Sequence, residues 1–238
     1  MISTEALVIS SLKYGEADLI TRIFSRELGM HSYMLKGVRK SRKGKLRISL
    51  FQPLSLLRIE TRHRDKGGLE YLKNAQILHV YHSIHQDIYK SSIAMFFSEV
   101  LTQLLSEQPA DENLFDYLQN VFIYLDHSEN SPNFSLKVLL DLTRFYGFQP
   151  DQDFKGAYFN MLDGRFDNDG LQPHHSTDVE ATFLKQLIGM NFEEVKQIKM
   201  SRSDRSALLH LIIDYFQIHL HAFKKPASLS ILKQLFDH

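Results

Sequence analysis

The residues of this chain best suited to binding chemistry form a basic loop, residues 36–47. Seven of its twelve residues are lysine or arginine and none is acidic. Strand-like segments precede and follow it, and a cationic loop on a small β-domain attracts polyanions, of which nucleic acid is the commonest. A solvated surface turn is the alternative. The candidate binding residues are Lys36, Arg39, Lys40, Arg42, Lys43, Lys45 and Arg47.

Four aromatic residues lie before and after this loop in the sequence. Single-stranded nucleic acid is typically held by a cationic groove together with exposed aromatic rings on which bases stack. The candidates for stacking are Tyr14, Tyr33, Phe51 and Tyr71. A small β-domain also needs aromatic residues to fill its core, so we expect most of these four side chains to lie inside it.

The histidines are the next candidates, because zinc needs three or four converging ligands. His79, His82 and His85 are spaced by three residues, and His174 adjoins His175. The first spacing follows one helical face only loosely, and no cysteine supplies a further ligand. We therefore expect surface histidines, no metal site and no cofactor.

Residues 163–170 resemble a calcium-binding loop in composition but not in register. If Gly170 takes the sixth position of such a loop, Arg165 falls at the first and Ser176 at the twelfth, where carboxylates are required. The segment is therefore predicted to be a turn-rich hairpin.

The sequence contains no motif of a known catalytic type. G-x-S-x-G, the P-loop, G-x-G-x-x-G and H-E-x-x-H are all absent. We predict a protein that is not an enzyme and has no catalytic residues. A metal-dependent nuclease built from scattered carboxylates stays open, since one sequence does not show which of them meet in space.

Charge is divided unevenly along the chain. The 238 residues have zero net charge, yet residues 1–80 carry 15 Lys and Arg against 7 Asp and Glu, and the remainder carry 13 against 21. Such asymmetry indicates that the N-terminal part contacts an anion. There are no cysteines, which excludes disulfides, thiolate zinc sites and cysteine nucleophiles. With no leader and no apolar run of about 18 residues, we expect a cytoplasmic protein.

The apolar pattern changes once along the chain. Short strand-like segments separated by turn residues predict a five-stranded barrel of the oligonucleotide-binding (OB) type over residues 1–80. Helical periodicity then predicts an all-helical domain over residues 81–238, interrupted by an irregular segment at about 148–178. The fold class is therefore α+β. The expected strands are 6–9, 19–24, 31–36, 54–62 and 69–72, and the clearest helices are 93–105, 114–125, 136–147, 179–189 and 208–220.

Several short motifs in order carry a family resemblance. The N-terminal ones are Tyr14-Gly15-Glu16-x-Asp18, Phe24-Ser25-Arg26-Glu27-x-Gly29, Lys36-Gly37-Val38-Arg39-Lys40 and Gln52-Pro53-Leu54. The later ones are Leu139-Leu140 through Tyr146-Gly147-Phe148-x-Pro150, and the run from Arg205 through His219-Leu220 to Leu229 and Leu232. Together they resemble the RecO family of DNA repair proteins over nearly the whole chain.

This resemblance implies a recombination mediator. Such a protein would bind single- and double-stranded DNA through an OB-fold domain and anneal complementary strands. It would also work with RecR and with the acidic tail of single-stranded DNA-binding protein (SSB), so that RecA loads. By position, Lys36, Arg39 and Lys40 match the basic turn of the family. Counted back from Gly147-Phe148, Lys137 falls where the resemblance places a basic residue for that acidic tail. Separately, we expect an apolar groove on the helical half, edged by a cation such as Lys137 or Arg144, to bind such a tail.

One departure from the family concerns zinc. Many members carry a four-cysteine zinc site after the Gly-aromatic-x-Pro segment, and this chain has no cysteine. We therefore predict no zinc there, and residues 151–175 must hold their shape by packing and turns or remain mobile. Apart from the family, the same basic loop would suit an adaptor for RNA or another polyanion, and that alternative stays open.

Overall fold

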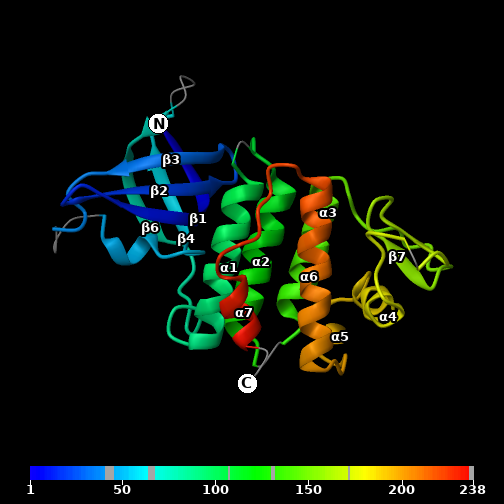
Figure 1. Cartoon of the computed structure of the whole chain (residues 1–238). Coiled ribbons are helices and arrows are strands. Elements are labelled where there is room, and N and C mark those ends of the chain that lie inside the picture. Colours follow the sequence, from blue (N-terminus) through cyan, green and yellow to red (C-terminus); the bar gives the residue numbers. More distant parts are fainter. Residues whose placement is uncertain (41–45, 64–67, 107, 130–131, 171, 236–238) are drawn as a thin grey trace. The chain divides into compact units, whose positions relative to one another are not determined.

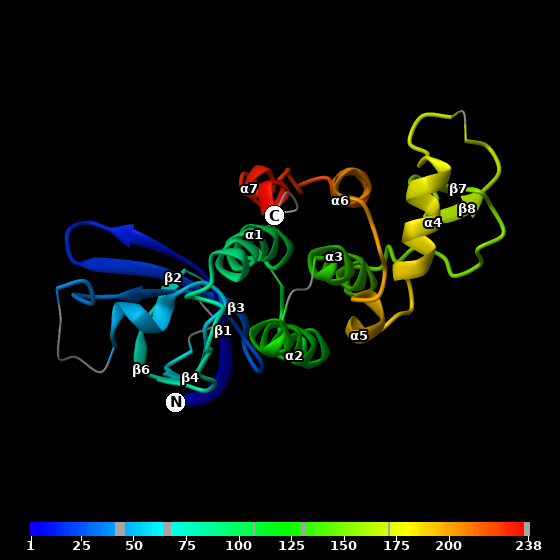
Figure 2. The same ribbon diagram turned by 90° about the horizontal axis from the view of Figure 1, so that it is seen from below.

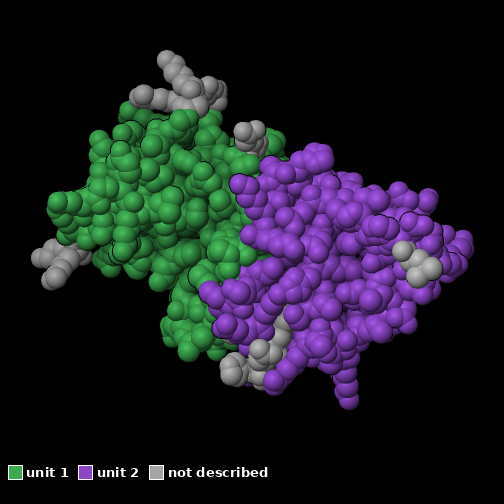
Figure 3. Space-filling view, in the orientation of Figure 1, with its two compact units in different colours: residues 1–127, 226–228 green, residues 128–225, 229–238 purple. Residues whose placement is uncertain are grey.

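The computed structural model describes residues 1–238 except 41–45, 64–67, 107, 130–131, 171 and 236–238. The chain divides into two compact units, coloured separately in Figure 3. The first comprises Met1–His127 with Pro226–Ser228, and the second Ser128–Lys225 with Leu229–His238. The change from strands to helices lies inside the first unit, between Ile77 and Ile88.

A curled six-stranded sheet forms the N-terminal half of the first unit (Figures 1 and 2). Its order is β5-β3-β2-β1-β4-β6, with every pairing antiparallel except β3 with β5. The half-barrel confirms the predicted OB-like, α+β fold. The strands are β1 (Ile2–Tyr14), β2 (Asp18–Ser25), β3 (Gly29–Leu35), β4 (Leu56–Thr61), β5 (Leu69–Glu70) and β6 (Leu72–Ile77), and a 3₁₀ turn, η1, spans Ile48–Phe51.

Both faces of the sheet are covered along the middle of β1, so Ala6, Leu7, Val8 and Ile9 are all buried. Ala6 and Val8 join the cluster inside the half-barrel. On β1's other side Ser98 of helix α1 (Ile88–Leu104) donates a 2.6 Å hydrogen bond to the Ile9 carbonyl. A strand covered on both faces reads as a continuous apolar run, as this one does in the sequence.

The last predicted strand, residues 69–72, proves to be the junction of two strands. β5 ends at Glu70, Tyr71 projects outward, and β6 begins at Leu72. The sequence did not show β6 because Leu72 and Ala75 are its only buried residues, and half-buried polar strands give little apolar signal.

Two backbone hydrogen bonds join β1 to the segment before β4, at a position where the backbone is irregular. Leu54 has a φ of 64°, a left-handed conformation that is costly for a branched side chain. Its N–H donates to the Val8 carbonyl at 2.7 Å, and the Val8 N–H donates to the Ser55 carbonyl at 2.9 Å. The β1–β2 register shifts between Val8 and Ser10, so Gln52-Pro53-Leu54 braces β1 beside this bulge.

Helices α1 and α2 (Glu112–His127) complete the first unit. Phe24 of β2 lies against Phe115 of α2, with ring centroids 6.2 Å apart. Gly29, at the start of β3, has a φ of 73°, and a Cβ there would lie 2.6 Å from the Pro109 carbonyl carbon. Glycine is therefore required at Gly29 by both conformation and space.

Asp126, near the end of α2, fastens the segment between β6 and α1. Its carboxylate accepts hydrogen bonds of 2.8 to 3.0 Å from the backbone N–H groups of His82, Ser83 and Ile84. Burial alone would raise the pKa of this carboxyl, but these donors outweigh it and lower the pKa to about 2.

We expect Asp126→Asn to lower the free energy of unfolding by roughly 2–4 kcal/mol at pH 7, because charge-assisted bonds are lost from a buried site. Because the folded pKa lies below the ordinary value of 3.8, this stabilisation is present above about pH 4 and is lost as pH falls towards 2. Urea denaturation of both proteins at several pH values measures it. Equal stability of the two proteins at pH 7 would contradict this role.

The second unit contains the remaining helices and a hairpin. Helix α5 was not predicted, because a helix of four residues shows no periodicity in the sequence. A capping box of Asn191 and Glu194 stabilises its start. Buried Asn133 links the elements, accepting from Arg205 Nε at 3.0 Å and donating to the Val195 carbonyl at 3.1 Å. The helices are α3 (Phe134–Phe145), α4 (Asp178–Leu187), α5 (Phe192–Val195), α6 (Arg202–His219) and α7 (Leu229–Leu235).

A hairpin is present, but it spans residues 158–167, so it begins five residues before the predicted segment 163–170 and ends three residues before that segment does. β7 (Tyr158–Asn160) pairs with β8 (Arg165–Asp167), and the rings of Phe159 and Phe166 lie 5.1 Å apart beneath it. The side chains of Asp167 and His175 meet at 3.2 Å. Packing and polar turns thus shape the described part of residues 151–175, the segment where the resemblance places the zinc site of other members. Among the described residues, none of the helices is both long enough and apolar enough to cross a lipid bilayer.

Candidate nucleic-acid interface

Two of the resemblance motifs fold onto each other at one end of the sheet. The β1–β2 turn contains Gly15 and Asp18, and the chain leaves β3 through Gly37. The Gly37 N–H donates to Asp18 Oδ1 at 2.8 Å, and the Arg39 N–H donates to the Ala17 carbonyl at 3.0 Å. Gly15 and Gly37 both have positive φ, 56° and 66°, which lets both turns be tight.

The side chains of Arg39 and Lys40 reinforce this joint. Arg39 Nη1 donates to the carbonyls of Gly15 and Glu16 at 3.1 and 3.2 Å. Lys40 Nζ lies 3.1 Å from Glu16 Oε2, in an ion pair whose side chains are 65% and 90% exposed. An exposed ion pair of this kind contributes little to stability, so Lys40 can exchange Glu16 for a phosphate at small cost.

Apolar anchors hold the basic loop at both ends. Val38 is buried in the half-barrel core, and Leu46 and Leu50 pack against the same cluster. Phe51 of η1 belongs to that cluster as well. Val38 and Leu46 therefore anchor the described residues on either side of positions 41–45 to the core.

The described cations of the loop remain open to solvent. Lys36, Lys40 and Arg47 are exposed, and Arg39 is half-buried. Arg42, Lys43 and Lys45 lie outside the described residues. Three of the four described candidates are thus exposed charges, and the fourth, Arg39, also builds the turn.

The aromatic candidates divide into two pairs. Tyr33 and Phe51 are buried in the core, at 0% and 2% exposure, whereas Tyr14 and Tyr71 are 54% and 55% exposed. We call the last two the exposed tyrosines. Lys36 Nζ lies 5.2 Å from the centroid of the Tyr71 ring, so a charge and a stacking surface stand side by side.

The two cations predicted to bind a protein partner lie on α3 and differ in exposure. Lys137 is 5% exposed and its ammonium pairs with Asp141 one turn later. Arg144 is exposed, with its guanidinium 4.6 Å from the ring centroid of Phe145. Lys137 could meet a partner's carboxylate only by giving up Asp141.

The histidines of the sequence motif do not converge on one point. His85 hydrogen-bonds through Nε2 to the Pro53 carbonyl at 2.8 Å, and the His82 backbone binds Asp126. His79 instead comes within reach of Asp126 and His127. Because the Asp126 carboxylate already accepts three backbone N–H groups, it is a structural anchor.

Comparison with known proteins identifies both halves of the chain. Residues 1–81 match the family model "Recombination protein O N terminal", and residues 85–228 match "Recombination protein O C terminal". The chain belongs to the RecO family. RecO proteins named "DNA repair protein RecO" match along their length: those of Christiangramia forsetii (40% identity, 99% of each chain), Flavobacterium johnsoniae (39%, 99% of each) and Phocaeicola vulgatus (35%, 98% of each).

The geometry explains the RecO motifs seen in the sequence. The Tyr14–Asp18 and Lys36–Lys40 motifs are two sides of one hydrogen-bonded joint, Gly29 occupies a site closed to a Cβ, and Leu54 stands beside the β1 bulge. Gly147, predicted to close the third helix, follows α3 with a φ of 77°. The Tyr14–Asp18 and Lys36–Lys40 motifs therefore build the turn through which the chain leaves β3.

Proposed function

We propose that this RecO-family protein is a DNA repair and recombination mediator that binds single- and double-stranded DNA and anneals complementary strands. The observation that carries the proposal is the pairing of exposed cations with an exposed tyrosine, Lys36 beside Tyr71, at one end of an OB-like sheet. The family membership fixes the biological setting, repair of DNA. The proposal places the protein in the cytoplasm with the chromosome.

Annealing of this kind needs no covalent chemistry and no cofactor. Two complementary strands repel each other through their phosphates, and a cationic surface lowers that repulsion while the bases stay available for pairing. If all seven loop cations engage phosphates, the logarithm of the binding constant falls with the logarithm of salt concentration at a slope of roughly −5 on single strands. Phosphate contacts carry no sequence information, which suits a general annealing factor.

The proposed partners are RecR and the acidic C-terminal tail of SSB, with RecA helped indirectly. On the second unit, Arg144 offers an exposed guanidinium beside the Phe145 ring, a combination that suits a tail with acidic and apolar residues. Lys137 would contribute only after its Asp141 pair opens.

The experiment that tests the function is annealing of complementary oligonucleotides coated with SSB. We expect this protein to accelerate annealing, and to do so less well when SSB lacks its acidic tail. Annealing at the spontaneous rate with both forms of SSB would refute the proposal. Competition with matched RNA distinguishes this function from that of an adaptor for RNA or another polyanion. Equal affinity for RNA and DNA would favour the adaptor.

A further inference from the structure

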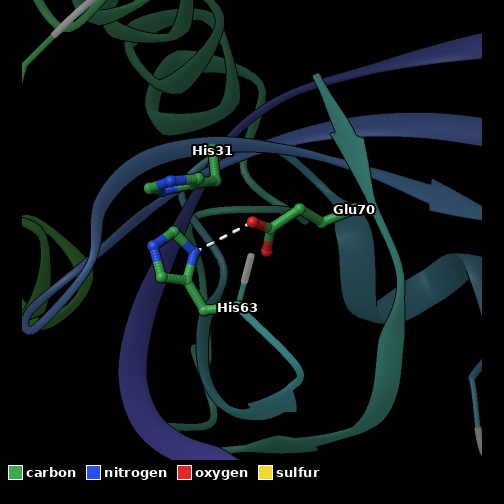
Figure 4. Close-up of side chains that lie close together, drawn as sticks. All are labelled: His31, His63 and Glu70. Carbon is green, nitrogen blue, oxygen red and sulfur yellow. Dashed lines mark hydrogen bonds and ion pairs between the residues drawn. The ribbon is translucent and has the colours of Figure 1, made fainter. Parts of the chain in front are cut away.

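Two histidines and a glutamate from separate parts of the chain converge at the edge of the half-barrel where β5 begins (Figure 4). His31 lies on β3, His63 follows the end of β4, and Glu70 ends β5. One ligand atom from each residue lies within 4.8 Å of the other two. The set is distinct from the basic loop and from the histidines at 79, 82 and 85.

The environment of Glu70 is unusual for a carboxylate. It is only 8% exposed and stands in register beside the buried Tyr33 of β3. Burial first, and then the Glu70 charge, raise the pKa of the Tyr33 hydroxyl. Buried carboxylates in proteins are paired with cationic groups or coordinate metal ions, and Glu70 has an imidazole, that of His63, beside it.

One imidazole contacts that carboxylate, and the second lies against the first. His63 Nδ1 lies 2.9 Å from Glu70 Oε1, and the His31 ring meets the His63 ring edge-on at 4.8 Å between centroids. His31 Nδ1 is buried and has no hydrogen-bond partner in the described part of the chain. A buried ring nitrogen with no partner costs free energy that a bound cation would recover.

We propose that His31, His63 and Glu70 bind a divalent transition-metal ion, with zinc the ion that best suits two imidazoles and one carboxylate. Tetrahedral zinc with ligands at about 2.0–2.1 Å places them roughly 3.3 Å apart, so modest side-chain movements close the observed set around an ion. The fourth position is left for water. The proposal departs from the expectation, drawn from the sequence, that the chain binds no metal.

A bound ion would tie β3, the end of β4 and β5 together. Tyr71 follows Glu70 directly, so the ion would also fix the exposed ring that the proposed function uses for stacking. The metal site itself depends on none of the DNA chemistry, so it can be tested without DNA.

The test is a titration of the untagged, full-length, chelator-treated protein with Zn²⁺ and, separately, with Co²⁺. We expect one equivalent of high-affinity binding, a tetrahedral Co²⁺ absorption band, and a rise in melting temperature with Zn²⁺. His63→Ala, which lies outside the strands, and Glu70→Gln are each expected to weaken binding by at least about tenfold. His221→Ala, at an exposed position, is the matched control and should bind like the parent.

Two results would overturn the proposal. One is the absence of one-equivalent binding in the parent protein. The other is binding that His63→Ala and Glu70→Gln leave unchanged, which would place the ion on other histidines. Circular dichroism of both variants confirms that they are folded. Loss of DNA binding with zinc binding intact would refute the proposed function alone.

Discussion

Replacing Lys40, Arg42, Lys43 and Lys45 together by alanine is expected to weaken binding to single-stranded DNA by about 100- to 1,000-fold at about 50 mM salt. Each lost phosphate contact removes about 0.7 from the slope of log affinity against log salt, so the slope should flatten by roughly 3. Fluorescence anisotropy of a labelled oligo(dT) at several salt concentrations measures both. Arg39 is left in place because it bonds the Gly15 and Glu16 carbonyls.

The matched control exchanges the same four residues for the other basic type, Lys for Arg and Arg for Lys. Charge is then retained, and the slope should stay near that of the parent. If the alanine variant binds with the parent's slope, phosphate contacts lie elsewhere on the molecule. The proposal expects the opposite outcome, and the exposure of Lys40 supports it.

The second large effect is expected at Tyr71. Loss of one stacked base costs about 1–3 kcal/mol, so Tyr71→Ala should weaken single-strand binding by roughly 5- to 150-fold. The salt slope should not change, because no charge is removed. Tyr71→Phe keeps the ring and should bind nearly as the parent does. Anisotropy titrations of the three proteins distinguish stacking from charge.

Leu69→Ala is the control for Tyr71, since Leu69 lies two residues away and is also exposed, at 47%. It removes apolar surface without removing a ring and should leave affinity unchanged. Equal losses in Tyr71→Ala and Leu69→Ala would mean that general apolar contact, rather than stacking, binds the strand. Tyr14→Ala extends the test to the other exposed tyrosine.

Local patterns accounted for much of the fold. The continuous apolar run at 6–9 predicted a strand, and periodicity predicted α1, α2, α3, α4 and α6, of which α1 and α6 begin five and six residues before their predicted starts. The helices bury one stripe of side chains, which leaves a helical period in the sequence, and the strand is buried on both faces, which leaves a continuous apolar run. Short or half-buried elements such as α5 and β6 leave none and were not predicted.

The candidate site was only partly readable from the sequence. The basic loop was evident from composition, but the division of four aromatic residues into buried Tyr33 and Phe51 and exposed Tyr14 and Tyr71 depends on the curl of the sheet. That division is a property of tertiary packing. The candidate aromatic residues could be named from the sequence, but which of them face solvent could not.

Two further features depend on contacts distant in sequence. Lys137 was placed by counting back from Gly147, yet residues 134–140 of α3 are all buried, so its position in the helix says nothing of exposure. The His31, His63 and Glu70 set joins segments separated by a strand and two loops, and no regular spacing marks it. The pairing of β3 with β5 brings the strand of His31 beside that of Glu70, and His63 arrives from the segment after β4.

Photochemical cross-linking of the full-length protein to oligo(dT), followed by peptide mapping, tests the central claim most directly. The account predicts cross-links at Tyr71, at Tyr14 or within residues 36–47, and their suppression by high salt. Cross-links found only in residues 128–238 would contradict it, because the strand would then bind the second unit instead of the basic end of the sheet.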